Sequence, residues 1–258
     1  MKIIVLVKEV PDTYGDRKLS LETGLADRAA SDAVLDEIGE RSIEVALSFA
    51  DKNPDTEVVL LSMAPESAAG SIRKGLAMGA SSAVQVVDER LSGADVGLTA
   101  KVLAAAIERT GFDLVIAGNQ STDGSAGVVP AMVAELLGVP QLTGLAAVEI
   151  TDAGVSGSRA TDDGVAQVSA GLPAVISITE ALPDARFPNF KGIMAAKKKP
   201  FEVLSLDDLG VTVDEAGVPH EIMTAVSEKP PRGAGVKITD EGDAGVQLAE
   251  FLISNRLA

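Results

Sequence analysis

The sequence predicts an α/β fold built on a doubly wound, mostly parallel sheet. Three observations lead to this prediction. Short apolar, often β-branched runs alternate with segments of helical periodicity through the first two-thirds of the chain. A loop of small residues, 118–130, separates one such run from the helix that follows it. The 258 residues, 46% of them hydrophobic, suffice for one large α/β domain or for one domain with an appendage.

The elements alternate as strand and helix, which favours parallel pairing through crossover helices. The apolar runs that predict buried strands are residues 3–7, 57–62, 83–87, 113–117 and 174–178. The segments with an apolar helical stripe are residues 31–50, 66–78, 94–109 and 131–137. The parallel strands place a ligand site at their carboxyl ends, where the loops near residues 10–15, 63–69 and 118–130 are expected to converge.

The pattern changes after Pro140. Residues 142–150, 155–160 and 165–170 are typical of strands and are separated by turn residues, which predicts an antiparallel hairpin addition. Beyond residue 200 the chain is irregular until a predicted helix at 243–256. So long an irregular tail is uncommon in a self-contained domain and indicates a C-terminal arm that lies on a partner.

The loop at residues 118–130 has the composition of an anion site. Its glycines let the backbone approach a phosphate, and the free N–H groups and the positive end of the following helix dipole point at one spot. It is neither a Walker A motif nor a G-x-G-x-x-G fingerprint. The alternative is an ordinary strand-to-helix turn with good capping residues. Asp123 is expected to cap the turn or the helix.

Composition excludes several classes of protein. The net charge of −16 argues against a nucleic-acid binder. The absence of cysteine excludes disulfides, thiolate metal sites and cysteine nucleophiles. By default we interpret the single histidine, His220, as structural or incidental. No apolar run is long enough to span a membrane, so we expect a cytoplasmic protein without membrane insertion.

Residues 181–200 combine apolar and basic side chains in an otherwise acidic chain. Phe187, Phe190, Ile193 and Met194 lie close to the run Lys197, Lys198 and Lys199. A charge run is usually a solvated face, but apolar anchors beside a basic segment fit protein docking better than catalysis. Tyr14, the only tyrosine, follows the first predicted strand, where it either packs on the surface or lies against a flavin.

Four motifs in order along the chain resemble the β subunit of electron transfer flavoproteins. They are Val7-Lys8-x-Val10-Pro11-Asp12, residues 72–80 (IRKGLAMGA), the loop 118–130, and residues 193–199 (IMAAKKK). The resemblance implies a Rossmann-like, adenine-nucleotide-binding domain at 1–180, a partner recognition loop at 181–200 and an arm at 201–258 that packs on an α subunit. It also implies a heterodimer whose α subunit holds most of one FAD, and an AMP bound without redox chemistry.

The resemblance assigns residues to each role by position. The expected AMP contacts are Leu6, Asp36, Met63, Gln120, Asp123, Gly124, Ser125, Ala126, Gly127, Val128 and Val129. The residues expected near FAD are Thr13 and Tyr14. The residues expected to bind partners are Phe187, Phe190, Ile193, Met194, Lys197, Lys198 and Lys199, with Phe190 as the docking side chain. No catalytic residue and no metal ligand is expected.

The function implied is that of an electron carrier. Flavin dehydrogenases, such as the acyl-CoA dehydrogenases of fatty acid β-oxidation, would reduce the FAD, and a membrane quinone oxidoreductase would receive the electrons. Two alternatives stay open: a nucleotide-binding regulatory protein of the stress-protein kind, and a bifurcating flavoprotein subunit that holds a second FAD in place of AMP.

Overall fold

The computed structural model describes residues 1–212 and 223–257 of the chain. The chain divides into two compact units, Met1–Thr224 and Ala225–Ala258. His220 and the part of the predicted tail around it lie outside the described residues.

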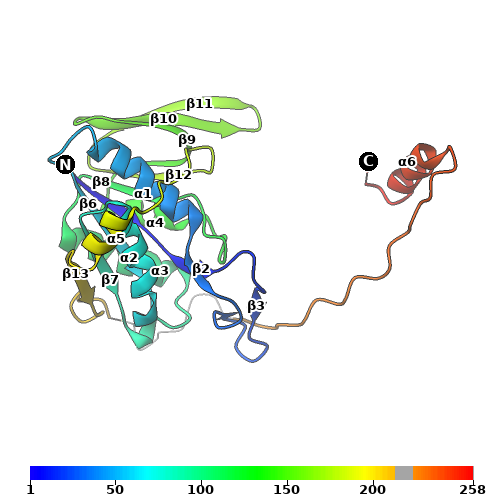
Figure 1. The fold of residues 1–258 in the computed structure, drawn as a ribbon, viewed down its shortest axis with the longest axis horizontal. Coiled ribbons are helices and arrows are strands. Elements are labelled where there is room, and N and C mark those ends of the chain that lie inside the picture. The colour runs from blue at the N-terminus through cyan, green and yellow to red at the C-terminus, as the bar shows by residue number, and fades with distance from the viewer. Residues whose placement is uncertain (213–222, 258) are drawn as a thin grey trace. The chain divides into compact units, whose positions relative to one another are not determined.

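The first unit is built on one large sheet (Figure 1). Its strands are β1 (Lys2–Leu6), β6 (Glu57–Met63), β7 (Ser82–Val86), β8 (Leu114–Gly118), β9 (Gln141–Ile150), β10 (Gly154–Thr161), β11 (Gly164–Gly171), β12 (Ala174–Ile178) and β13 (Phe201–Leu204). Their order in space is β11-β10-β9-β12-β8-β1-β6-β7-β13. All neighbours from β9 to β13 pair in parallel, which confirms the predicted doubly wound fold.

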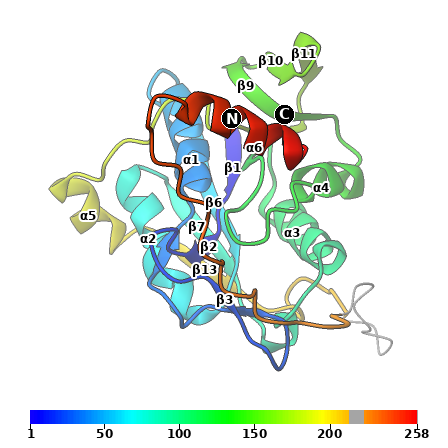
Figure 2. The ribbon, with the colours of Figure 1, turned by 90° about the vertical axis from the view of Figure 1, so that its right-hand side faces the viewer.

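Helices cover both faces of this sheet (Figure 2). They are α1 (Glu37–Ala50), α2 (Ala69–Met78), α3 (Val96–Thr110), α4 (Val129–Leu137) and α5 (Phe190–Ala196), with short 3-10 turns η1 (Glu66–Ala68) and η2 (Glu89–Leu91). Ile43 of α1 and Ile72 of α2 belong to the core on one face, whereas Val102 of α3 and Val133 of α4 belong to the core on the other. The two cores hold the sheet between them.

Helix α1 begins later than its predicted start at residue 31. Residues Ala33–Leu35 form strand β5, which pairs antiparallel with β2 (Glu9–Pro11). The Asp36 N–H then donates to the carbonyl of Lys8 at 2.9 Å, and the helix starts at Glu37. The prediction of helix over 31–36 was therefore wrong, because a partner strand distant in sequence competes for this backbone.

The predicted antiparallel addition is confirmed. Strands β9, β10 and β11 form a meander at one edge of the sheet, and β9 also pairs in parallel with β12. At the other edge, β13 pairs with β7, although sequence analysis placed these residues in the arm. Leu204 and Leu206 are buried in the core beneath it. The sheet therefore continues past residue 201, and the second unit begins at Ala225.

The segment of the first unit between β2 and β5 forms a small lobe. We call residues 12–32 the β3 lobe, after the two-residue strand β3 (Lys18–Leu19), which pairs with β4 (Ala26–Asp27). Among these residues only Gly24 is buried. The lobe therefore has little packed core of its own.

The second unit contains the predicted C-terminal helix as α6 (Ala244–Ser254). Its larger apolar side chains are exposed, namely Val246, Leu248, Phe251 and Ile253. In the described part of the chain, no helix combines the length and the apolar character needed to cross a membrane.

Candidate functional site: an anion cradle and an exposed apolar segment

The loop after β8 lies at the point where the sheet changes direction. Strands β1 and β8 are adjacent and parallel, and the chain proceeds from β1 to β6 on one side and from β8 to β12 on the other. A crevice at the carboxyl ends of such strands is the usual ligand site of a doubly wound sheet. The structure therefore puts the glycine-containing loop, residues 119–128, where a ligand site is expected.

The backbone of this loop forms a cradle of free N–H groups. Ser125 and Gly127 have positive φ angles of 51° and 67°, and the Ser125 N–H donates to the Ser121 carbonyl at 3.0 Å. Among the described residues, no acceptor lies on the N–H groups of Ala126, Gly127 and Val128. Helix α4 begins directly afterwards, so its positive end adds to the attraction for an anion. We call residues 119–128 the anion cradle.

Asp123 belongs to the cradle, and two cationic side chains bind it. Its carboxylate accepts from Lys8 Nζ and from Arg28 Nη2, each at 2.7 Å, and its side chain is only 7% exposed. Burial alone would raise its pKa, but the hydrogen bonds and charges of Lys8, Ser121 and Arg28 hold that pKa well below its usual range. The Gly124 N–H also donates to this carboxylate at 2.6 Å.

Asp36 closes the cradle from the side of α1. One carboxylate oxygen, Oδ2, accepts from the Thr122 N–H at 2.9 Å. The other, Oδ1, is buried and has no partner among the described residues. Burial raises the pKa of Asp36, even though the hydrogen bonds from the backbone oppose this. The cradle, to which Asp36 is bonded through Thr122, thus offers free N–H donors for an anion, and Asp36 Oδ1 is an acceptor for a ligand N–H or O–H donor.

We expect Asp36→Asn to change how stability depends on pH. Because the folded-state pKa of Asp36 lies above its ordinary value of 3.8, the contribution of this group is fully present below about pH 4 and is lost as pH rises through the raised pKa. The free energy of unfolding of the wild type, relative to Asp36→Asn, should therefore fall over that range. Urea unfolding of both proteins at pH 4, 5, 6 and 7 measures the difference, and a difference that rises with pH contradicts the assignment.

The other residues predicted for this site lie at strand ends, in the cradle itself and in the β3 lobe. Leu6 and Met63 end β1 and β6 and are half-buried. Gln120 is exposed, and its N–H donates to Asn119 Oδ1 at 2.9 Å. Thr13 and Tyr14 lie in the β3 lobe, where the Tyr14 side chain is 95% exposed. The structure thus brings the predicted cradle residues together and leaves Tyr14 facing away from the packed core.

Sequence analysis gave no role to three cations that the structure brings to the cradle. Lys8 and Arg28 bind Asp123, and Arg17 donates to the Thr122 carbonyl. A signal was available: an acidic residue inside an anion site needs nearby cations, and the loop after β1 holds several basic residues. That loop was already expected to converge on this end of the sheet.

We call residues 181–200 the recognition segment. Its most exposed large apolar side chains are Phe187 and Phe190, 94% and 80% exposed, and Ile193 and Met194 are also exposed. Asn189 caps α5 by accepting from the Gly192 N–H at 2.8 Å. The four exposed side chains form what we call the apolar face of the segment.

Arginine side chains fasten the first half of the recognition segment to α1. Arg186 donates to both carboxylate oxygens of Glu44 at 2.7–2.8 Å and to Asp51 at 2.9 Å. Arg41 donates to the Leu182 carbonyl and to Asp184. Burial alone would raise the pKa of Glu44, but the bonds from Arg186 lower it. The residue before Phe187 is therefore held by paired, charge-assisted contacts.

The second half is fastened to α2. Arg73 donates to the Ala196 carbonyl at 3.0 Å, and Lys199 donates to the Leu76 and Ala80 carbonyls at 2.9 and 2.6 Å. Burial lowers the pKa of Lys199. Sequence analysis expected Lys199 to bind partners, but the structure directs its ammonium group inward. Lys197 and Lys198 are exposed.

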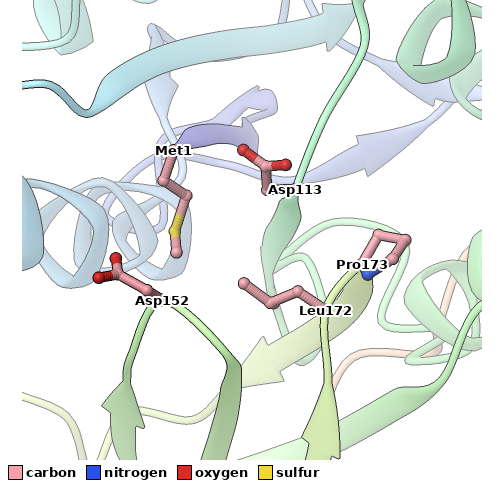
Figure 3. A pocket seen from close by; sticks show the side chains of 5 residues that line it. All are labelled: Met1, Asp113, Asp152, Leu172 and Pro173. Carbon is pink, nitrogen blue, oxygen red and sulfur yellow. The ribbon is translucent and has the colours of Figure 1, made fainter.

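The opposite end of the sheet carries a separate small pocket. It is lined by Met1, Asp113, Asp152, Leu172 and Pro173, near the amino ends of the strands (Figure 3). Asp113 accepts from the Lys2 N–H at 2.6 Å. No predicted site residue lines this pocket. The described residues also contain no group of three or more His, Cys, Asp or Glu side chains that could hold a metal ion.

Fold and site together define a doubly wound α/β protein with an anion cradle at its switch point. The chain matches the electron transfer flavoprotein domain over residues 23–209 and belongs to that family. It is 47% identical to the electron transfer flavoprotein subunit beta of Mycobacterium leprae (strain TN), over 99% of this chain and 98% of the relative.

More distant relatives also align over nearly their full length. The electron transfer flavoprotein subunit beta of Megasphaera elsdenii is 30% identical over all of both chains. The subunit CarD of a caffeyl-CoA reductase–Etf complex of Acetobacterium woodii is 32% identical over 98% of this chain and 97% of its own. The chain is thus an electron transfer flavoprotein subunit, and its relatives are named as carriers of electrons.

Proposed function

We propose that this chain is the β subunit of a heterodimeric electron transfer flavoprotein that binds AMP in the anion cradle. Its α partner would hold most of the FAD. The observation that carries the AMP assignment is the set of three backbone N–H groups without an acceptor at Ala126–Val128, and the buried Asp36 Oδ1, which has no partner among the described residues, supports it. Family membership sets aside the alternative of a stress-type regulatory protein.

The residues present fit an adenine nucleotide. The phosphate would lie on the backbone N–H groups of the cradle, with Gln120 and residues 123–129 around it. Leu6 and Met63 offer half-buried apolar surface to the adenine side. Asp36 Oδ1 would accept from a ligand N–H or O–H donor, which removes the cost of leaving a buried acceptor unpaired.

The FAD side of the proposal concerns the β3 lobe. Thr13 and Tyr14 lie there with exposed side chains, so they are free to meet a cofactor held by another chain. FAD, when bound, supplies the electron-accepting and electron-donating chemistry. This chain would orient the flavin edge and exclude water from it, and it would contribute no acid, base or nucleophile.

The apolar face of the recognition segment would bind the donor proteins. Phe187, Phe190, Ile193 and Met194 are all exposed within eight residues of chain, and the exposed Lys197 and Lys198 follow them. Aromatic anchors surrounded by polar groups are typical of interaction hot spots. We infer that flavin dehydrogenases, such as acyl-CoA dehydrogenases, dock here and that a membrane quinone oxidoreductase takes the electrons onward, in the cytoplasm.

The exposed apolar side chains of α6 fit the predicted arm. Val246, Leu248 and Ile253 are each at least half exposed in the second unit. An amphipathic helix of this kind is stable when its apolar face is covered. We propose that residues 225–258 pack on the α subunit, which would cover these side chains in the heterodimer.

Cofactor content tests the AMP assignment directly. We expect the purified heterodimer, denatured and analysed by chromatography, to release one FAD and one AMP. Two FAD and no AMP would overturn the assignment in favour of the bifurcating alternative. A matched preparation of Gly127→Ala, which places a side chain at a φ of 67°, should retain less AMP at an unchanged FAD content.

A further inference from the structure

Besides the packing of Met223 on Gly24 and of Leu25 beside Gly93, the side chains of two arginines hold the β3 lobe. In the described part of the chain, the side-chain hydrogen bonds that leave residues 12–32 come from Arg17 and Arg28. Arg17 donates to the Thr122 carbonyl of the anion cradle, and Arg28 donates to Asp123 and to the Glu9 carbonyl. Both arginines thus attach the lobe to the cradle by hydrogen bonds.

Asp123 is the junction of this attachment. It is the one cradle side chain that binds the lobe, and its other carboxylate oxygen binds Lys8 and the Gly124 N–H. The next residues, from Ser125, adopt the positive φ angles that shape the free N–H groups. A ligand that fixes those N–H groups thereby fixes the turn on which the Asp123 carboxylate is mounted.

The charges around Asp123 also favour coupling between the ligand and the lobe. Lys8, Arg17 and Arg28 outnumber the carboxylates of Asp123 and Asp36 near the cradle, in a chain whose net charge is −16. A bound anion would be attracted by all three cations and would draw the two arginines of the lobe toward the cradle. The lobe and the ligand thus favour the same arrangement.

We propose that Asp123 is a positioning residue that couples ligand binding in the anion cradle to the position of the β3 lobe. The proposal rests on the AMP assignment above for the identity of the ligand. The lobe carries Tyr14, whose N–H donates to Asp12 Oδ1 at 2.9 Å, so the occupied cradle also fixes the place of Tyr14. Coupling is reciprocal: a change that frees the lobe weakens AMP binding by the same factor.

Hydrogen exchange of the full-length chain, with and without saturating AMP, tests this coupling. We expect AMP to slow exchange in both residues 119–128 and residues 12–32, the latter by about tenfold, within the usual range of couplings between sites. In Asp123→Asn, AMP should still slow hydrogen exchange in the cradle but no longer in the lobe. The Kd for AMP should rise by about the same tenfold factor.

Two further variants keep the result clear. Arg28→Gln breaks the same bridge from the exposed lobe side and should behave like Asp123→Asn, even if the latter folds poorly. Lys18→Gln, which changes an exposed lobe cation whose ion-pair partner within the described residues is Asp16, should keep the wild-type response. If AMP slows hydrogen exchange in the wild-type cradle but not in the wild-type lobe, only the coupling is overturned. A cradle that does not respond overturns the AMP assignment as well.

Discussion

Phe190→Ala should raise the KM of a donor dehydrogenase for the heterodimer by about 30-fold, with little change in kcat. The Phe190 ring is 80% exposed and stands at the start of α5, where Asn189 caps the helix. Truncation of such an aromatic anchor costs about 2 kcal/mol or more of binding free energy, which is close to that factor. Steady-state electron transfer from the dehydrogenase, followed as flavin reduction, measures it.

Val165→Ala provides the matched control. Val165 is a large apolar side chain, 66% exposed, on β11 of the hairpin addition and outside the recognition segment. It should leave the KM unchanged, as expected for an isolated exposed apolar residue. Equal KM values for wild type and Phe190→Ala would place donor docking elsewhere on the molecule.

Gly192→Ala should impair electron transfer to a similar degree, although it removes no side chain from the apolar face. A methyl group at Gly192 would lie 2.3 Å from the Ala77 carbonyl oxygen of α2. Because backbone cannot yield easily, α5 must move away from α2 and carry Phe190 and Met194 with it. Overpacking of this kind also costs about 1–3 kcal/mol of stability, which thermal unfolding should detect.

Gly70→Ala is the matched control for this variant. Gly70 lies in α2, the same helix that α5 contacts, and a methyl group there meets no atom within 4 Å. Alanine is the better helix former, so stability should hold or rise by up to about 1 kcal/mol. If Gly192→Ala transfers electrons at the wild-type rate while α5 is shown to be displaced, the position of the apolar face does not matter for docking.

The sequence pattern was sufficient for the elements that bury long apolar runs. The local pattern of apolar residues predicted strands such as residues 114–118 and helices such as α3. Their order along the chain predicted the parallel sheet. The pattern was insufficient where distant segments decide the structure. Strand β13 is four residues long and exists because β7 offers it an edge, and β5 exists because β2 pairs with it.

The candidate site shows the same division. The anion cradle could be predicted because its glycines and the following helix are contiguous in sequence. The sequence signalled that cations should lie near Asp123 but not which ones, because Arg17 reaches Thr122, and Arg28 reaches Asp123, across about a hundred residues of chain. For Lys199, the nearby run of lysines suggested exposure, whereas the carbonyl oxygens at the end of α2 draw its ammonium group inward.

The fastening of the recognition segment at both ends has a consequence for turnover. Arg186 and Arg73 hold the segment in place, so a protein that docks there as proposed would not need to order it and would need only modest contacts. A small, preformed contact can also separate quickly, because affinity within a family of interfaces is set mostly by the dissociation rate. A carrier that alternates between a donor and an acceptor needs short residence times on each, and a rigid platform makes selective recognition compatible with them.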